Sequence, residues 1–202
     1  MQHAKLIKSM GISLCLLLSA SCVASQPDAE AKSAKPAAAE ASAEKCPAVG
    51  EVLKVLGQKQ IYAQTPELFL PTLASHLKTG KDETKDLGPA EKMRSISLSA
   101  DWLTSGEAVY RVIKAGAEFN SLTLDISKNC FNAPKDFIAL GQNLIGKGGK
   151  KIKMPPPDTS EIIISQWKDP DINMIRTLEI TASQDSYLIA VKRDPDSEGA
   201  GG

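Results

Sequence analysis

The sequence predicts an α+β domain: a sheet of about five mainly antiparallel strands with helices on one face. Two runs, 95–100 and 121–126, alternate apolar and polar residues as half-buried strands do. Other segments space their apolar residues as helices do, and three strand-like runs follow near the C-terminus. A strand, a helix, a strand, a helix and then three strands is an order typical of α+β domains.

The first part of the domain is expected to be helical and then irregular. Apolar residues at helical spacing predict a helix over 47–56, which Gly57 would end. A second helical start lies at residues 65–67, but Pro71 interrupts it, so we expect short helical pieces to about residue 78. Residues 79–92 are polar almost throughout and indicate a loop.

Two further helices are predicted in the middle of the chain. Residues 104–107 have the spacing of a capping box, and an apolar stripe follows, so we expect a helix over 105–115 that ends before Gly116. Asn132 is the predicted cap of a helix that places an apolar face over 137–145 and ends at Gly146.

The last part of the domain is predicted to be a loop followed by strands. The Lys-, Gly- and Pro-rich stretch 147–158 reads as a loop. The three expected strands are 161–167, 175–182 and 187–192, with residues 183–186 as a hairpin turn between the last two. Residues 194–202 are predicted to be a disordered tail, and no internal repeat is visible.

The N-terminus has the layout of an export signal. Lys5 and Lys8 precede a short apolar run from Gly11 to about Ala20, and small residues follow. This run is too short for a bilayer core, which needs about 20 apolar residues. Removal of residues 1–21 turns 24 basic and 24 acidic residues into 22 and 24, a net charge of −2. A nearly neutral chain argues against nucleic acid as the main partner.

The segment Ser19-Ala20-Ser21-Cys22 resembles the lipobox of bacterial lipoproteins, although Ser19 stands where that family usually has Leu. The resemblance implies that Cys22 becomes an acylated (palmitate-bearing) N-terminus, and Val23 after it implies sorting to the outer membrane. Residues 22–45 would then be a flexible linker rich in Ala, Lys, Glu and Pro that carries the domain 46–193. The alternative is cleavage within residues 22–25, which would give a soluble periplasmic protein.

Two cysteines remain for the domain, Cys46 and Cys130. An even pair in an oxidising compartment predicts a disulfide. In the chain-entropy model, a bond that closes a loop of about 84 residues stabilises the fold by about 4–5 kcal/mol.

The sequence gives little support for catalysis. His76 is the only histidine of the mature chain, so histidine-rich metal sites are excluded, and no metal or cofactor is expected. We therefore predict a protein that is not an enzyme. A carboxylate hydrolase remains as an alternative, with candidates Asp101, Asp125, Asp169 and Asp171.

Two loops are predicted to bind a protein partner. The first combines glycines and prolines with four cations, which are Lys147, Lys150, Lys151 and Lys153. The second places an aromatic residue beside mixed charges, in Trp167, Lys168, Asp169, Asp171 and Asn173. The first could also be an ordinary solvated connector, and Trp167 could be a core residue.

In its organisation the chain resembles lipid-tethered immunity proteins and lysozyme inhibitors. The lipobox-like Ser19-Ala20-Ser21-Cys22 and the Cys46/Cys130 pair carry this resemblance. It implies a periplasmic lipoprotein, held to the outer membrane by its lipid alone, that inhibits an enzyme attacking the cell envelope. The alternatives are a scaffold lipoprotein of an envelope machine, such as a secretion system, and the carboxylate hydrolase.

Overall fold

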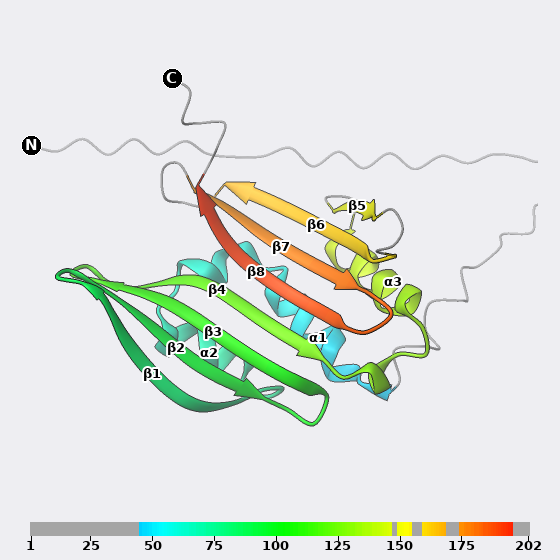
Figure 1. The fold of residues 1–202 in the computed structure, drawn as a ribbon, viewed down its shortest axis with the longest axis horizontal. Helices are drawn as coiled ribbons and strands as arrows, with labels where there is room; N and C mark the ends of the chain where they lie inside the picture. The colour runs from blue at the N-terminus through cyan, green and yellow to red at the C-terminus, as the bar shows by residue number, and fades with distance from the viewer. Residues whose placement is uncertain (1–44, 147–148, 155–158, 169–173, 196–202) are drawn as a thin grey trace, which may run out of the picture. The chain divides into compact units, whose positions relative to one another are not determined.

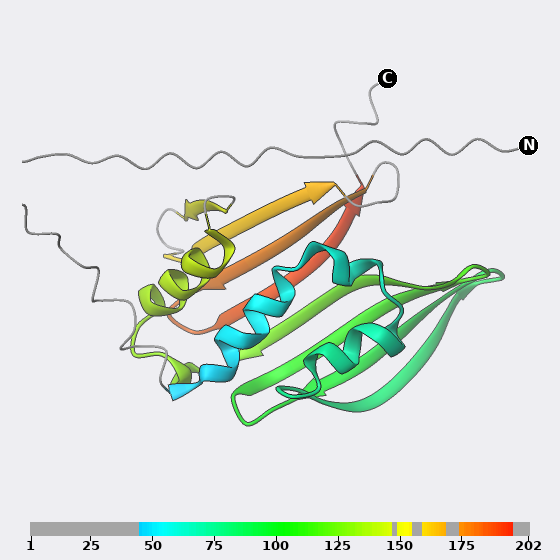
Figure 2. The ribbon, with the colours of Figure 1, turned by 180° about the vertical axis from the view of Figure 1, so that it is seen from behind.

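Eight antiparallel strands form one sheet, and the helices lie against one of its faces (Figures 1 and 2). The computed structural model describes residues 45–146, 149–154, 159–168 and 174–195. Strand order across the sheet is β1-β2-β3-β4-β8-β7-β6-β5. The α+β class is confirmed, but the expected sheet of about five strands is too small.

The elements follow one another in two similar series. The first series is α1 (Pro47–Leu56), η2 (Lys59–Ala63), α2 (Pro66–Leu73), β1 (Lys78–Gly88), β2 (Glu91–Ser99), β3 (Leu103–Ile113) and β4 (Gly116–Ile126). After η3 (Lys128–Cys130), the second is α3 (Pro134–Ile145), β5 (Lys150–Lys153), β6 (Glu161–Lys168), β7 (Met174–Ala182) and β8 (Tyr187–Pro195).

Each series is a helical segment followed by four antiparallel strands, and the two sets of strands meet where β4 pairs with β8. The two halves of the sheet are therefore topologically equivalent, with β1 and β5 at the two edges. No repeat is visible in the sequence, because the equivalent strands differ in length and side chains, as in β1 with 11 residues and β5 with 4.

One hydrophobic core runs beneath both halves of the sheet. It contains residues of α1, α2 and α3 and of six strands, β2, β3, β4, β6, β7 and β8. In α1 the predicted apolar stripe is buried in full: Val49, Val52, Leu53 and Leu56. Burial of such side chains contributes about 1.5–3 kcal/mol each, so this stripe holds α1 to the sheet.

Several predicted elements are confirmed. The helix over 47–56, the short helix after Thr65 and the last three strands lie where the sequence predicts them. Gly146 ends α3 with a positive φ of 69°, a conformation that favours glycine. In the predicted turn 183–186, the Ser183 N–H donates to the Ser186 carbonyl oxygen at 2.9 Å. The cap of α3 is Ala133, one residue after the predicted Asn132.

The predicted loop 79–92 is wrong, because it contains the edge strand β1 and the start of β2. All 11 residues of β1 are exposed, so neither face of the strand needs apolar side chains. Without a buried face there is no alternating pattern, and a charged edge strand has the composition of a loop.

The predicted helix over 105–115 is also wrong, because these residues form β3. The spacing of Val109, Val112 and Ile113 fits a helix, but these are β-branched residues, which pack well in strands. In β3 the buried residues are Ala108 and Tyr110, which alternate along the strand. Pairing with β2 and β4 on both sides overrides the local helical pattern.

The ends of the predicted sheet also need correction. Residues 150–153, predicted as part of a loop, form the short edge strand β5. Strand β8 extends to Pro195, two residues past the predicted boundary of the domain. Residues 147–148, 155–158 and 196–202 lie outside the described residues.

Candidate functional site

A cavity of about 560 Å³ lies between α2 and the first two strands. Its lining is Pro66, Glu67, Leu70, Pro71, Ala74, Leu77, Lys78, Thr79 and Arg94. The apolar part comes from α2 and the segment after it, and the polar part comes from β1, β2 and Glu67. Ligand sites in proteins have this size and this mixture of an apolar wall with a few polar groups. We call this cavity the α2–β1 groove.

The sequence of α2 explains why one side of the helix borders the groove. Thr65 precedes Pro66, which occupies the first helical turn, where its missing N–H costs nothing. Phe69 and Leu73 are buried in the core. Leu70, one position after Phe69, is half-buried and faces the groove, whereas Leu68 is 62% exposed and does not line it.

Arg94 forms the charged end of the groove. Its Nη1 donates to Glu67 Oε1 at 2.7 Å, and its Nη2 and Nε donate to Asp82 at 2.7 and 3.0 Å. These hydrogen bonds lower the pKa of both carboxyl groups and raise the pKa of Arg94. All three groups are therefore ionised at neutral pH, and this end of the groove has a net negative charge.

Tyr110 adds a polar group next to this end. It lies directly opposite Arg94 in the pairing of β2 with β3 and is fully buried. Its hydroxyl has no hydrogen-bond partner among the described residues. Burial is the main cause that raises its pKa, and the nearby charge of Glu67 raises it further. An unsatisfied buried hydroxyl is uncommon in proteins, and here it belongs to the cross-strand neighbour of Arg94, a residue of the groove lining.

Strand β1 gives the groove an open sheet edge. β1 pairs with β2 on one side, and within the described residues no strand pairs with its other side. The backbone N–H and C=O groups on that side are available to an added strand. Lys78 and Thr79 at the start of β1 line the groove itself.

The helix of the second half lies close to the sheet in the part of the chain that the structure describes. There α3 packs directly on β6 and β7. A Cβ built on Gly141 of α3 would come within 2.7 Å of Ile180 and 3.3 Å of Ile163, so the helix is in close contact with the sheet. Gly149, which follows α3, is closely surrounded as well: a Cβ built on it would lie 2.9 Å from the side chain of Ile163 and 3.2 Å from that of Ile145. Over its described residues, α3 thus packs closely on the sheet.

Trp167 lies in a different part of the sheet, at the end of β6. Its half-buried ring is 5.7 Å from the ring of Tyr62 in η2, and Lys59 Nζ is 5.7 Å from its centroid. Arg176, opposite Trp167 on β7, lies 5.3 Å from the Tyr62 ring and 5.0 Å from that of Phe119. Trp167 therefore helps to hold η2 on the sheet, in keeping with the interpretation of it as a packing residue.

Only some of the other predicted binding residues lie in the part of the chain that the structure describes. Lys168 is exposed beside it, but Asp169, Asp171 and Asn173 lie outside the described residues. Lys150, Lys151 and Lys153 are exposed on β5, which pairs only with the start of β6, at residues 161–164. Lys147 is outside the described residues. The described parts of the two predicted loops therefore lie toward opposite ends of β6 (Figure 1).

The lysines of β5 have a structural explanation as well. Lys151 Nζ is 2.9 Å from Glu161 on β6, the neighbouring strand. Three of the four residues of β5 are lysines, and this concentration of one sign of charge on a short edge strand hinders pairing with a further chain.

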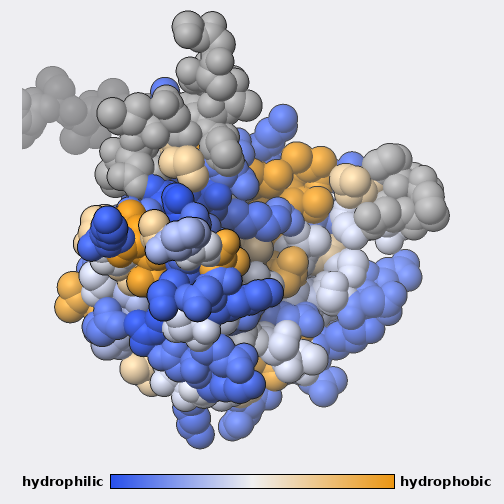
Figure 3. All heavy atoms as spheres, turned by 60° about the vertical axis from the view of Figure 1, so that its left-hand side comes forward, coloured by the Kyte–Doolittle hydropathy of each residue, from blue (hydrophilic) through white to orange (hydrophobic). Residues whose placement is uncertain are grey.

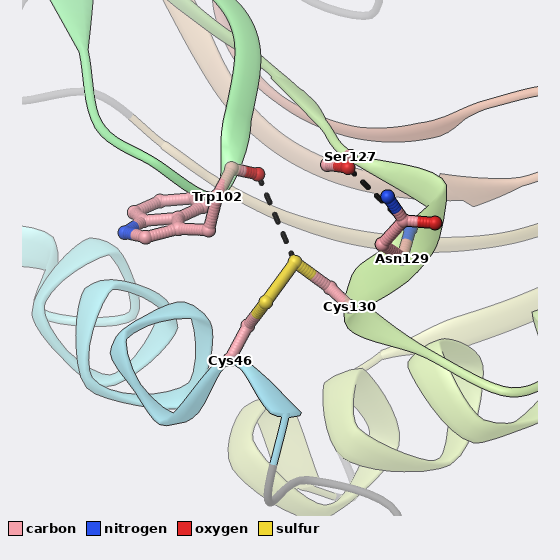
Figure 4. The surroundings of a disulfide bond; sticks show 5 residues. All are labelled: Cys46, Trp102, Ser127, Asn129 and Cys130. Atoms are coloured by element: carbon pink, nitrogen blue, oxygen red, sulfur yellow. Dashed lines mark hydrogen bonds between the residues drawn. A yellow bond between two sulfur atoms is a disulfide. The ribbon is translucent and has the colours of Figure 1, made fainter.

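The disulfide joins Cys46, just before α1, to Cys130 after β4, with a Cα–Cα distance of 5.1 Å (Figure 4). This is the pairing that the sequence predicts. Trp102 lies beside it, with its carbonyl oxygen 3.8 Å from Cys130 Sγ. A cavity of about 320 Å³ lies next to the bond and is bordered by Lys45 and Asp101 among others.

The described residues contain no group of three or more His, Cys, Asp or Glu side chains that could hold a metal ion. The candidate acids Asp101 and Asp125 lie in the turn before β3 and on β4, and Asp169 and Asp171 are outside the described residues. None of the helices in the described part of the chain has the length and hydrophobicity needed to span a membrane. Cys22 also lies outside that part.

Exposed apolar surface is limited elsewhere. Figure 3 shows one side of the molecule, on which hydrophilic residues predominate and apolar ones gather in small groups. In the described ranges the large hydrophobic residues that are clearly exposed are Leu68, Leu87 and Met154. The α2–β1 groove adds an apolar wall to these, with Leu70, Pro71, Ala74 and Leu77 in its lining.

The residues of this groove were not identified from the sequence. Glu67, Asp82 and Arg94 are far apart in the chain, and Asp82 falls in a segment read as a loop. No short motif connects them. The one available signal is Arg94, a charged residue on the buried face of the strand that also carries Ile96 and Leu98.

Comparison of the chain with protein-family models, with curated proteins and with solved structures gives no significant match.

Proposed function

We propose that this protein is a non-enzymatic lipoprotein of the cell envelope that binds and inhibits a protein partner, and that the α2–β1 groove is its binding site. The lipid at Cys22 and the linker 22–45 hold the domain at the outer membrane, facing the periplasm. The partner is an enzyme that attacks the envelope.

The observation that supports the proposal best is the groove itself. It combines an apolar wall, ionised groups at one end and an open sheet edge. Protein interfaces owe most of their affinity to a few apolar side chains that enter such pockets, with charged groups at the rim. The half-buried Leu70 is the apolar side chain of the wall that a partner would contact.

The test uses the full chain with its lipid as bait in an extract of envelope proteins. The captured partner is identified by mass spectrometry, and its enzymatic activity is measured with increasing amounts of the bait. We expect inhibition that is complete at one bait molecule per enzyme.

Two matched variants locate the site. Leu70→Glu places a carboxylate in the groove and should weaken inhibition at least tenfold, as for a hot-spot residue. Leu68→Glu makes the same change two residues away on the exposed side of α2 and should leave inhibition unchanged. A captured partner that stays fully active, or equal loss in both variants, would refute the proposal. A second comparison, of Trp167→Ala with the wild type, tests the surface predicted from the sequence.

A further inference from the structure

We propose that the partner binds in the groove as an extended segment, added as a strand antiparallel to β1, with a basic residue before its apolar residues and a carboxylate after them. This inference rests on the proposed function and specifies its binding mode. An antiparallel direction follows from the sheet, in which every described pair of strands is antiparallel.

The main chain of β1 provides the first argument. Strand addition to an open edge gives affinity through backbone hydrogen bonds, and pockets for alternate side chains give specificity. β1 is 11 residues long and fully exposed, and the groove lies beside its first residues on the helix-covered face. In an added strand, every second side chain would point to this face and toward the groove.

The groove favours apolar side chains at those positions. Leu70, Pro71, Ala74 and Leu77 form its wall on the helix side. Tyr110, buried next to the charged end, has a hydroxyl that lacks a hydrogen-bond partner among the described residues.

The charges at the two ends of the groove fix the direction of the segment. Lys78 begins β1, and no ion pair to it is found among the described residues, so this end is positive. The other end, with Glu67 and Asp82 around Arg94, is negative. A strand antiparallel to β1 has its C-terminal end near Lys78. Charge complementarity therefore requires a carboxylate there and a basic side chain near Asp82.

A second copy of this chain fits the edge less well. In a two-fold symmetric antiparallel pair, one residue lies opposite its own copy. Centring the pair on Lys81, Asp82, Glu83 or Lys85 places like charges directly opposite each other. Centring it on Thr84 places Asp82 opposite Asp86, and centring it on Gly80 avoids like charges but pairs only residues 78–82 of each copy. A partner of different sequence avoids this repulsion.

The test selects binders from a phage-displayed library of random heptapeptides against the full chain, and then measures the binding of synthetic copies by fluorescence polarisation. We expect enriched peptides with apolar residues at alternate positions, a basic residue before them and an acidic residue or free C-terminus after them. N-methylation of alternate backbone amides should weaken binding at least tenfold in one of the two registers, because it removes strand hydrogen bonds.

Matched variants show where on the protein the peptide binds. Leu70→Glu and the exposed Ala74→Glu should each weaken peptide binding at least tenfold, and Leu68→Glu should not. Lys78→Glu should weaken it more than threefold, whereas Lys85→Glu, the same charge change seven residues further along β1 and outside the groove lining, should have little effect. Because Ala74 is exposed, the Ala74→Glu variant still tests the groove if Leu70→Glu misfolds.

Three results would overturn the inference: no enrichment, equal binding by Leu70→Glu, Ala74→Glu and wild type, or equal binding of both N-methylated peptides and their parents. In the third case the groove is an apolar pocket without strand addition. If the peptides fail while Leu70→Glu still abolishes inhibition of the captured enzyme, the binding mode is wrong but the proposed function stands. If inhibition fails as well, both are wrong.

Discussion

Tyr62 and Tyr110 are both buried, but their hydroxyl groups have different surroundings. The Tyr62 hydroxyl donates to the carbonyl oxygen of Leu56 at the end of α1. The Tyr110 hydroxyl has no partner within the described part of the chain. A satisfied buried hydroxyl stabilises a fold, whereas an unsatisfied one costs desolvation free energy.

The two Tyr→Phe variants should therefore differ. Tyr62→Phe is expected to lower the free energy of unfolding by about 1 kcal/mol, because it removes a hydrogen bond and orphans the Leu56 carbonyl. Tyr110→Phe should leave it unchanged or raise it. Urea denaturation of both variants and the wild type measures these free energies of unfolding. A loss of about 1 kcal/mol in Tyr110→Phe would mean that its hydroxyl is hydrogen-bonded after all.

The tyrosines also predict how stability depends on pH. Burial raises the pKa of all three, Tyr62, Tyr110 and Tyr187. Because the folded state holds these protons more tightly, the stabilisation is complete below the unfolded pKa of about 10 and is lost as the pH rises above it. Absorbance at the phenolate band should rise together with loss of circular dichroism in alkali. Phenolate formation in the folded protein below pH 10.5 would contradict this.

At the scale of single elements, two helix glycines provide a test of packing. A Cβ on Gly50 of α1 would meet Leu140 at 3.7 Å, an ordinary contact. A Cβ on Gly141 of α3 would lie 2.7 Å from Ile180, which is fully buried. Alanine is a better helix former than glycine by about 1 kcal/mol, so the contacts decide the sign at each position.

Gly50→Ala should raise the free energy of unfolding by about 0.5–1 kcal/mol. Gly141→Ala should lower it by about 1–3 kcal/mol, because the closely packed α3 must shift or Ile180 must leave its rotamer. Thermal unfolding of the two variants beside the wild type gives both values. Stabilisation by Gly141→Ala would show that α3 is less tightly packed than described.

The elements that the sequence predicts well are those with one buried face. The stripe of α1 and the alternating pattern of 121–126 both reflect burial against the core. Strand β1 could not be predicted in this way, because none of its residues is buried. Strand β3 was missed because its β-branched residues also fit helical spacing, and only pairing with two neighbours decides between the alternatives.

The candidate site could not be predicted for a related reason. The groove forms where α2 meets the open edge of β1. Because β1 was predicted to be a loop, the hydrogen bond between Arg94 on β2 and Asp82 on β1 could not be predicted either. The sequence instead pointed to Trp167 and to lysines in a loop. In the structure Trp167 packs on Tyr62, and the lysines that are described lie on an edge strand, Lys150 among them.

For the whole molecule, the disulfide is the main covalent constraint that the structure shows. It joins the start of α1 to the end of the first four strands, 84 residues apart. In the chain-entropy model, its loss costs about 4–5 kcal/mol, a large part of the stability of a domain of this size.

Cys46→Ser with Cys130→Ser, or reduction of the wild type, should therefore lower the urea midpoint strongly. The inhibitory activity of the reduced protein should persist in buffer as long as it stays folded, because the bond does not line the α2–β1 groove. An unchanged midpoint after reduction would mean that the cysteines are not joined in the native protein. Thiol titration of the untreated protein is the control.

The central claim is that the protein acts through the α2–β1 groove. Amide hydrogen exchange of the full chain, measured with and without its captured partner, tests this most directly. We predict that protection increases in β1 and α2, including Lys78 and Leu70, and not at Trp167. Protection confined to β5 and the end of β6, with β1 exchanging as in the free protein, would contradict the account.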